Sequence, residues 1–291
     1  MTTEKLPLSW RLDDAPTVIS RSLLLSRSLW IQSVTLKQTS DLYELLIDLR
    51  ASPRPAILRG VSEEIALRFC NAGGHAFQSG IEAALDLNDA AWHRSSLREL
   101  ARRALRYGRI EYFPAPQSDR PFPDLQELRS RSAYAHRPTL RGLFLTDASQ
   151  WHKAWSFVVG GQVVGLVTAS RRGEQAYHTE ILMRAKDAPK GTMEALIIRA
   201  ATDLKQEGAY ELSLGECPFV VGDPPDIRIH LFGRMMSHAY HARGLYAFKA
   251  KFHPQWRPVF LVSRRRLFLP LVDMFFTTGS ARLFFDALFH R

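Results

Sequence analysis

The sequence has few of the features that mark several large protein classes. Its only two cysteines, Cys70 and Cys217, exclude a disulfide framework and cannot by themselves make a structural zinc site. It has no uninterrupted apolar run of about 18–20 residues and no apolar stretch of a secretory signal near its start. Its histidines lack a ligand spacing such as HExxH, so we predict no metal site. These absences lead us to expect a cytoplasmic protein with reduced thiols.

The composition is that of a globular protein with a basic surface. The chain has 291 residues, of which 46% are apolar and 11% aromatic, enough for one large domain or two smaller ones. Lysine and arginine number 39 and acidic residues 29, which gives a net charge of +10. Such an excess favours a polyanionic partner, nucleic acid or anionic lipid, although a solvated basic surface has the same composition.

A proline-rich segment divides the chain. Residues 113–123 hold four prolines and no hydrophobic period, which is typical of a linker. We therefore predict an N-terminal part over 1–112, the linker, a C-terminal part over 124–262, and a basic and apolar tail over 263–291.

Hydrophobic periodicity predicts a mixture of helices and strands. Apolar residues at helical spacing predict helices over 40–50, 62–70, 88–108 and 193–207. Apolar, β-branched segments predict strands over 155–159, 163–170, 177–184 and 210–214, with Gly160-Gly161 as a hairpin turn between the first two. Strands that mostly precede one helix indicate an α+β fold with a mixed sheet, not an alternating doubly wound one.

Four arginines recur every four residues in the predicted helix over 88–108. They are Arg94, Arg98, Arg102 and Arg106. At this spacing they share one face and repel one another, and a polyanion lying along that face would offset the repulsion. A solvent-exposed face partly neutralised by Glu99 is the alternative.

A second candidate anion site lies between the strand over 177–184 and the helix over 193–207. Free amides at a helix start bind anions, Gly191 would let a phosphate approach closely, and Lys190 adds positive charge. An ordinary strand-to-helix turn explains the same residues.

Three blocks of sequence carry a family resemblance: HTEILMRAKDAPKGTMEALI at 178–197, ELSLGECPF at 211–219 and GLYAFKAKFHPQWRPVFLV at 244–262. Within them stand Leu-Met-Arg at 182–184, Ala-Pro-Lys-Gly-Thr-Met-Glu at 188–194, Leu-Gly at 214–215 and Phe-Lys-Ala-Lys-Phe-His-Pro-Gln-Trp at 248–256. In this order the blocks resemble the C-terminal catalytic domain of bacterial phosphatidylglycerol lysyltransferases, the multiple peptide resistance factors.

The resemblance implies a fold and an activity. The fold would be two GNAT-like (acyl-CoA N-acyltransferase-like) mixed-sheet halves, of which the first is degenerate. The activity would be transfer of an amino acid from aminoacyl-tRNA, the donor, to the hydroxyl of a phosphatidylglycerol-type lipid, without a bound cofactor. The alternatives are a CoA-dependent N-acyltransferase with acyl-CoA as donor, and a non-catalytic member that binds tRNA or lipid.

The chain departs from the family pattern at one acidic position. The family's acid would stand at Ile181, whereas here the nearest acid is Glu180, which shares a strand face with His178 and Arg184. Candidate relay groups for aminoacyl transfer are His178, Glu180 and Glu216. Candidate substrate-binding residues are Arg184, Lys190, Gly191, Thr192, Lys249 and Lys251, the last two predicted on one face of a strand. The resemblance makes tRNA the expected polyanion for Arg94, Arg98, Arg102 and Arg106.

The tail combines arginines with interrupted apolar blocks. Arg264, Arg265 and Arg266 precede phenylalanine- and leucine-rich segments broken by Pro270, Asp273 and Gly279. This pattern suits a segment lying on anionic lipid, and it equally suits a helix pair docked on the core. We therefore predict a cytoplasmic protein that binds peripherally at the inner face of the membrane if the tail is interfacial.

Overall fold

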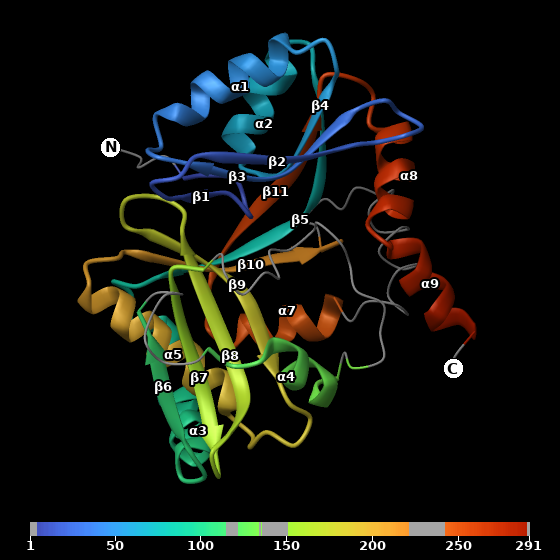
Figure 1. Ribbon diagram of the computed structural model, residues 1–291. Helices are drawn as coiled ribbons and strands as arrows, with labels where there is room; N and C mark the ends of the chain where they lie inside the picture. Colours follow the sequence, from blue (N-terminus) through green and yellow to red (C-terminus); the bar gives the residue numbers. More distant parts are fainter. Residues whose placement is uncertain (1–4, 115–121, 134, 136–150, 221–241, 290–291) are drawn as a thin grey trace.

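The computed structural model describes residues 5–114, 122–133, 135, 151–220 and 242–289 (Figure 1). The strands are β1 (Arg11–Leu12), β2 (Thr17–Ser22), β3 (Leu29–Leu36), β4 (Ala56–Val61), β5 (His75–Asp86), β6 (Arg109–Phe113), β7 (Lys153–Val159), β8 (Gln162–Arg171), β9 (Ala176–Arg184), β10 (Glu211–Pro218) and β11 (Gln255–Ser263). The helices are α1 (Asp41–Ala51), α2 (Glu63–Asn71), α3 (Ser95–Leu105), α4 (Leu125–Arg131), α5 (Thr192–Gln206), α7 (Ala242–Ala250), α8 (Phe268–Thr277) and α9 (Ser280–Phe289), with a short 3-10 turn at Ala91–His93.

All of these strands belong to one mixed sheet. Its order is β1-β3-β4-β11-β5-β10-β9-β8-β7-β6, with β2 added antiparallel to β3. The pairs β3–β4 and β9–β10 are parallel, and the strands over 153–184 form an antiparallel meander that begins with the turn at Gly160-Gly161. The predicted α+β class with a mixed sheet is therefore confirmed.

The sheet is built from two halves of the same plan. In each half a helix joins two parallel strands, and a second helix and an antiparallel strand follow: β3-α1-β4-α2-β5 in the first half and β9-α5-β10-α7-β11 in the second. The last strand of each half pairs with the other half, since β5 pairs with β10 and β11 pairs with β4. Because β5 and β11 also pair with each other, the two halves share one sheet and a rigid centre.

The cores show that the division between the halves differs from the predicted one. The first half encloses a cluster around Trp10, Ile31 and Leu58, and the larger cluster of the second half includes residues of α3 and β6. Strand β6 pairs with β7, and α3 packs on α5. The basic helix therefore belongs to the second half rather than to a part ending at 112, because its apolar side is needed to cover α5. Most of the predicted linker, 115–121, lies outside the described residues.

Each parallel strand pair ends in the same way. β3 and β4 pair over three residues each, Leu29–Ile31 with Ala56–Leu58, and β9 and β10 pair over Ala176–His178 with Glu211–Ser213. Beyond these residues β4, β9 and β10 continue paired only with their other neighbour, whereas β3 pairs with β2 and, at Thr35 and Leu36, also with β1. Two residues further on stands a glycine with a left-handed backbone, Gly60 (φ 75°) in the first half and Gly215 (φ 82°) in the second. We call each point where the parallel strands part a strand fork.

The first-half fork is filled by the chain's own N-terminal segment. The Leu8 amide donates to the Gly60 carbonyl at 2.8 Å, and a β-carbon at Gly60 would stand 2.6 Å from that of Leu8. Leu6, Leu8 and Trp10 are buried there. The N-terminal segment therefore occupies the space at this fork.

The tail forms two helices, and the first of them docks on the first half. Leu267 and Met274 pack with Leu23, Trp30 and Ile57 in a third core cluster. The docked-helix alternative of the sequence analysis is therefore present in α8. Among the residues that the structure describes, no helix combines the length and the apolar character needed to cross a membrane.

Two sequence-predicted elements are corrected by the structure. Helix α3 begins at Ser95 rather than at residue 88, because the preceding residues form a 3-10 turn that buries Trp92. The strand predicted for Lys249 and Lys251 is wrong: Lys249 lies in the last turn of α7, and Lys251 follows that helix. Phe248 and Phe252 are four residues apart and pack edge to face with ring centres 5.6 Å apart. This spacing of four fits a helix as well as the two-residue period of a strand, which is why a strand was predicted.

Candidate functional site

The second-half fork carries four polar side chains, whereas three of the four equivalent positions in the first-half fork are apolar. His178 and Glu180 project from β9, Ser213 and Glu216 come from β10, and all four side chains are largely buried. Counting from the last residues of each parallel pairing, the equivalent positions in the first half are Ile31, Ser33, Leu58 and Val61. Buried polar groups cost free energy unless they are paired, so this concentration indicates a functional site.

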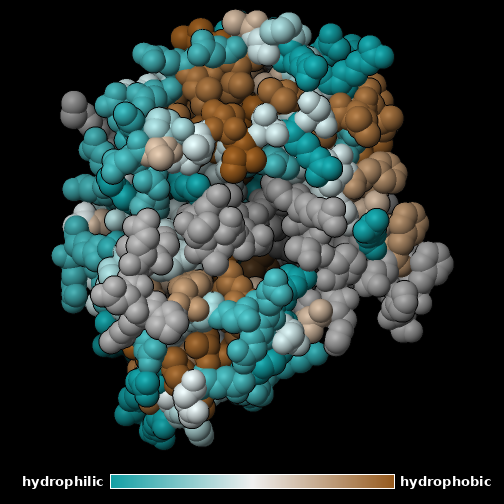
Figure 2. Space-filling view, viewed as in Figure 1, coloured by the Kyte–Doolittle hydropathy of each residue, from teal (hydrophilic) through white to brown (hydrophobic). Residues whose placement is uncertain are grey.

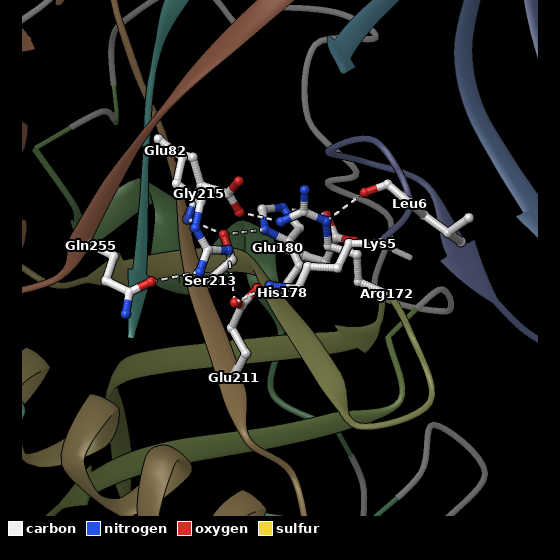
Figure 3. A network of polar contacts seen from close by, with 11 residues as sticks. Lys5, Leu6, Glu82, Arg172, His178, Glu180, Glu211, Ser213, Gly215 and Gln255 are labelled. Carbon is white, nitrogen blue, oxygen red and sulfur yellow. Dashed lines mark hydrogen bonds and ion pairs between the residues drawn. The ribbon is translucent and has the colours of Figure 1, made fainter. Parts of the chain in front are cut away.

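A buried ion pair supports one side of the site. Arg172 pairs with Glu82 of β5, and its Nε also donates to the Leu6 carbonyl at 2.6 Å. Burial alone would raise the pKa of Glu82, but the Arg172 guanidinium and a hydrogen bond from Ser213 lower it to about 2. Glu82 is therefore a permanent carboxylate. Figure 3 shows it with Arg172, His178 and Ser213 in one network.

This carboxylate fixes the proton on His178. Burial, with Arg172 and Lys249 nearby, lowers the pKa of His178 to about 3, so the imidazole is neutral. The Ser213 hydroxyl gives its single hydrogen to Glu82, and its oxygen accepts from the Gly215 amide (3.1 Å) and from His178 Nδ1 (3.3 Å). With the serine hydrogen on the Glu82 side, we infer that Nδ1 carries the imidazole proton and that Nε2 is an acceptor.

Glu180 faces that acceptor. Its Oε2 lies 3.9 Å from His178 Nε2, and its Oε1 is buried without a hydrogen-bond partner among the described residues. Burial raises the pKa of Glu180 to about 7, against the opposing effects of Ser170 and several arginines. A carboxyl group with this pKa and a free oxygen exchanges a proton at neutral pH, which is the property of a general base. Sequence analysis thus placed His178 and Glu180 correctly on one face of a strand.

Glu216 has a different part from Glu180. Arg59 of β4 donates to its Oε2 at 2.9 Å, and Ser79 donates to its Oε1 at 2.6 Å. Both carboxylate oxygens are occupied, so Glu216 joins the two halves through Arg59 and is a poor proton acceptor. Glu180 therefore fits the predicted role of a proton relay better than Glu216 does.

Lys249 reaches the fork from α7. Its ammonium is buried and donates to the Glu216 carbonyl at 3.0 Å, and a β-carbon at Gly215 would stand 3.7 Å from it and 3.3 Å from His178. Burial lowers the pKa of Lys249. The structure therefore brings Lys249 near His178, although by a helix rather than by the predicted strand.

The residues at the start of α5 form a separate group. Arg184 and Lys190 are exposed, and Arg184 stands four residues beyond Glu180, about 13 Å along an extended strand. At Gly191 (φ 94°) the close approach is made by α3, since a β-carbon there would stand 2.2 Å from the Leu100 carbonyl oxygen. The Thr192 hydroxyl is turned onto the Pro189 carbonyl at 2.7 Å.

Lys251 belongs to this second group as well. Its ammonium pairs at 2.9 Å with Glu194, an acid in the first turn of α5. The positive end of the helix is thus already balanced by a carboxylate of its own. Gly191, Thr192 and Lys251 make contacts within the protein where a phosphate was predicted, and Arg184 and Lys190 are exposed.

The four arginines of the basic stripe are all exposed on the outer side of α3. Arg94 and Arg106 flank the helix, and Arg98 and Arg102 lie within it. Glu99 accepts from Arg102 at 2.6 Å and from Arg103 at 2.9 Å. Part of the positive charge of the stripe is thus neutralised by Glu99, as in the solvent-exposed alternative. Arg98 lines a surface groove of about 560 Å³ with Trp92, His93 and Lys205.

Sequence reasoning missed Glu82, Arg172 and Ser213. One signal was available: Glu82 is the lone acid in the apolar run Gly80–Leu85, and a charge inside such a strand must be paired when the strand is buried. The partner was not readable, because Arg172 is 90 residues away along the chain.

Comparison with known proteins agrees with this architecture. Residues 37–263 match the family model described as phosphatidylglycerol lysyltransferase, C-terminal. The chain belongs to this family. The match begins directly after β3 and includes α1, β4, the second-half fork and all of β11, so it extends over most of both halves.

Two curated relatives have related sequences. The lysylphosphatidylglycerol biosynthesis bifunctional protein LysX of Nocardia farcinica is 26% identical over 241 residues, which covers 75% of this chain and 21% of the relative. The phosphatidylglycerol lysyltransferase of Bacillus subtilis is 28% identical over 232 residues, 74% of this chain and 27% of the relative. The chain thus spans about a quarter of the length of these relatives.

A solved structure shares the fold. The structure of L-PGS from Bacillus licheniformis superposes with a TM-score of 0.66 at 19% identity, over 94% of this chain and 88% of that one.

Proposed function

We propose that this protein transfers an aminoacyl group from aminoacyl-tRNA to the hydroxyl of a phosphatidylglycerol-type lipid, with Glu180 as general base. The observation that carries the proposal is the buried carboxyl of Glu180, whose pKa is raised to about 7 and whose Oε1 has no hydrogen-bond partner among the described residues. The names of the family and of its two curated relatives supply the type of reaction.

The reaction needs one proton to move and one ester bond to be exchanged. The lipid hydroxyl oxygen attacks the aminoacyl ester carbonyl as its proton passes to Glu180 Oε1, and a tetrahedral intermediate forms. Its oxyanion is stabilised by the Lys249 ammonium. The bond to the tRNA ribose oxygen then breaks, and that oxygen takes the proton back from Glu180. The products are the aminoacyl lipid and free tRNA, and Glu180 is regenerated.

His178 lies beside Glu180 in this scheme. Its Nε2 lies 3.9 Å from Glu180 Oε2, too far for a hydrogen bond, and the neutral ring adds no positive charge that would lower the pKa of Glu180. The proton on Nδ1 is held by Ser213 and, through it, by Glu82.

The first-half fork supports the place of the substrate. There the turn at Leu8-Ser9 lies against the fork, and the Leu8 amide bonds to the carbonyl of Gly60. The second-half fork has the same backbone plan around Gly215 but polar walls. We place the aminoacyl ester in this second fork.

The remaining predicted residues are proposed to hold the polyanionic ends of the two substrates. The exposed cations Arg184 and Lys190 lie beyond the fork and suit a phosphate of the tRNA terminus or of the lipid. The stripe Arg94, Arg98, Arg102 and Arg106 suits the tRNA backbone. Helix α3 and Glu194 occupy the start of α5, where a CoA pyrophosphate was the alternative, and this favours aminoacyl-tRNA as donor. A lipid acceptor requires contact with a membrane surface, which fits a peripheral location at its inner face.

The test is an aminoacyl-transfer assay with purified protein, radiolabelled lysyl- or alanyl-tRNA and phosphatidylglycerol vesicles, with product lipid identified by mass spectrometry. We expect Glu180→Gln to lower turnover by about 10²–10⁴-fold, because the amide cannot accept the proton. Glu174→Gln is the matched control. Glu174 is an exposed acid just before β9, and its replacement should leave turnover unchanged. Normal turnover of Glu180→Gln, or transfer from acyl-CoA instead of aminoacyl-tRNA, would contradict the proposal.

A further inference from the structure

Helix α8 is apolar on the side that faces solvent as well as on the side that faces the core. Its sequence, FLPLVDMFFT, contains one charged residue, Asp273. A helix apolar all round is normally buried all round. In α8 only one side is covered within the part of the chain that the structure describes, so the other side lacks a partner.

The covered side is firmly held. Leu267 and Met274 pack into the third core cluster. Asp273 is buried and accepts hydrogen bonds from the amides of Leu25 and Ser26 at 2.9 and 3.0 Å and from the Ser26 hydroxyl at 3.1 Å. The only charge of α8 therefore anchors the loop between β2 and β3 beside the helix and adds no polarity to the outer side.

The outer side presents a continuous apolar surface. Phe268, Leu269 and Phe276 are 76%, 54% and 60% exposed, and at 100° per residue they fall within an arc of about 100° on the helix. The anchored loop adds Leu24 and Leu25, which are 87% and 62% exposed. We call these five residues the α8 face. Figure 2 shows hydrophobic side chains gathered along the edge of the molecule where α8 runs in Figure 1.

Exposed arginines surround this face. Arg264, Arg265 and Arg266 lead directly into α8, Arg27 stands in the anchored loop, and Arg282 lies in α9. Among the described side chains of 21–29 and 264–285 the sole acid is the buried Asp273. Apolar side chains bordered by unopposed arginines match the interface of an anionic bilayer, where the former enter the acyl boundary and the latter meet phosphates.

We propose that the α8 face docks this protein on the surface of an anionic phospholipid bilayer. The proposal rests on the proposed function for its purpose, delivery of a lipid acceptor, but its physical basis is the face itself. A protein partner would need acids opposite the arginines around an apolar centre, and a second copy of this chain would bring arginines against arginines. The charge pattern therefore favours lipid.

The test is sedimentation of the full-length protein with vesicles of equal parts phosphatidylglycerol and phosphatidylcholine, and with phosphatidylcholine alone. We expect pelleting with the anionic vesicles only, weaker at high salt. Phe268→Ser combined with Leu269→Ser should weaken binding at least tenfold. Ile47→Ser combined with Leu67→Ser removes two equally exposed apolar side chains from α1 and α2 and should leave binding unchanged. Arg265→Gln should weaken it about fivefold.

Three results would overturn the docking surface: wild-type protein that stays in the supernatant at low salt, equal losses in both serine pairs, or a lipid-free dimer that the Phe268 and Leu269 changes dissociate. Transfer to phosphatidylglycerol dispersed in detergent micelles separates this proposal from the proposed function. If the docking proposal is wrong and the proposed function is right, all variants still transfer the aminoacyl group in micelles. If the proposed function is wrong and the docking proposal is right, transfer in micelles is absent but the protein still binds vesicles through the α8 face.

Discussion

At the scale of single residues, the site depends on how burial sets the charge of Glu180. Because the pKa of Glu180 is raised to about 7 and the proposed general base acts in its ionised form, turnover should fall tenfold per pH unit below about 7 and level off above it. The neutral His178, with a pKa of about 3, adds no second break in this range. A pH–rate profile under single-turnover conditions checks this expectation. A profile that is flat between pH 5.5 and 8 would assign the proton transfer to another group.

The same residue predicts a conflict between stability and activity. Glu180 titrates near 4.5 in an unfolded chain and near 7 in the folded one, so the folded state holds the extra proton between these values. The free energy of unfolding therefore falls as pH rises from about 4.5 to 7, and the loss is complete above 7. Glu180→Gln removes this penalty and should be more stable than the wild type at pH 8, by about 2–3 kcal/mol, yet inactive. Urea unfolding of the wild type and of Glu180→Gln at pH 5 and pH 8 measures this difference. If the two proteins differ in unfolding free energy by the same amount at both pH values, the carboxyl is not the cause.

At the scale of elements, the two forks give an internal comparison. A β-carbon at Gly60 would meet Leu8 at 2.6 Å and displace the N-terminal segment, whereas at Gly215 its neighbours, at 3.3 and 3.7 Å, are the ring of His178 and the end of the Lys249 side chain. Both substitutions also carry the cost of a left-handed backbone, about 1 kcal/mol. We expect Gly60→Ala to lose about 2–4 kcal/mol of unfolding free energy and Gly215→Ala about 1 kcal/mol, and Gly215→Ala alone to lose turnover out of proportion to its stability. Denaturant melts beside turnover assays decide this, and the reverse order of stabilities would refute the filled first fork.

How far the sequence predicts these elements depends on the range of the contacts involved. Helix α5 and the Gly160-Gly161 hairpin are set by neighbours in sequence, and both lie where periodicity predicts them. The period of two that places His178 and Glu180 on one face is equally local. The exchange of β5 and β11 between the halves is not, because nothing near either strand specifies its partner. For the same reason the pairing of Glu82 with Arg172, and hence the proton position on His178, could not be foreseen.

At the scale of the whole molecule, two separate groups of exposed arginines have different proposed partners. Figure 1 shows α3 at one end of the molecule and α8 beside the other half, so the arginine stripe and the α8 face are well separated. The second-half fork lies in the sheet between them. This arrangement allows a tRNA on α3 and a bilayer on α8 to be held at once, with the ester and the lipid hydroxyl meeting at Glu180.

The tRNA side of this arrangement is testable through Glu99. This acid holds Arg102 and Arg103, so it withholds positive charge from the stripe formed with Arg94, Arg98 and Arg106. Glu99→Gln should tighten tRNA binding and steepen the plot of log K against log[salt] by roughly 0.7–0.9 for each arginine that then meets a phosphate. Glu64→Gln on α2 is the matched control, since Glu64 pairs with Arg68 at the same helical spacing but far from the stripe. Filter-binding titrations across a salt series measure both variants. Equal changes in Glu99→Gln and Glu64→Gln would show that only net charge matters. An unchanged slope in Glu99→Gln would show that α3 does not contact the tRNA.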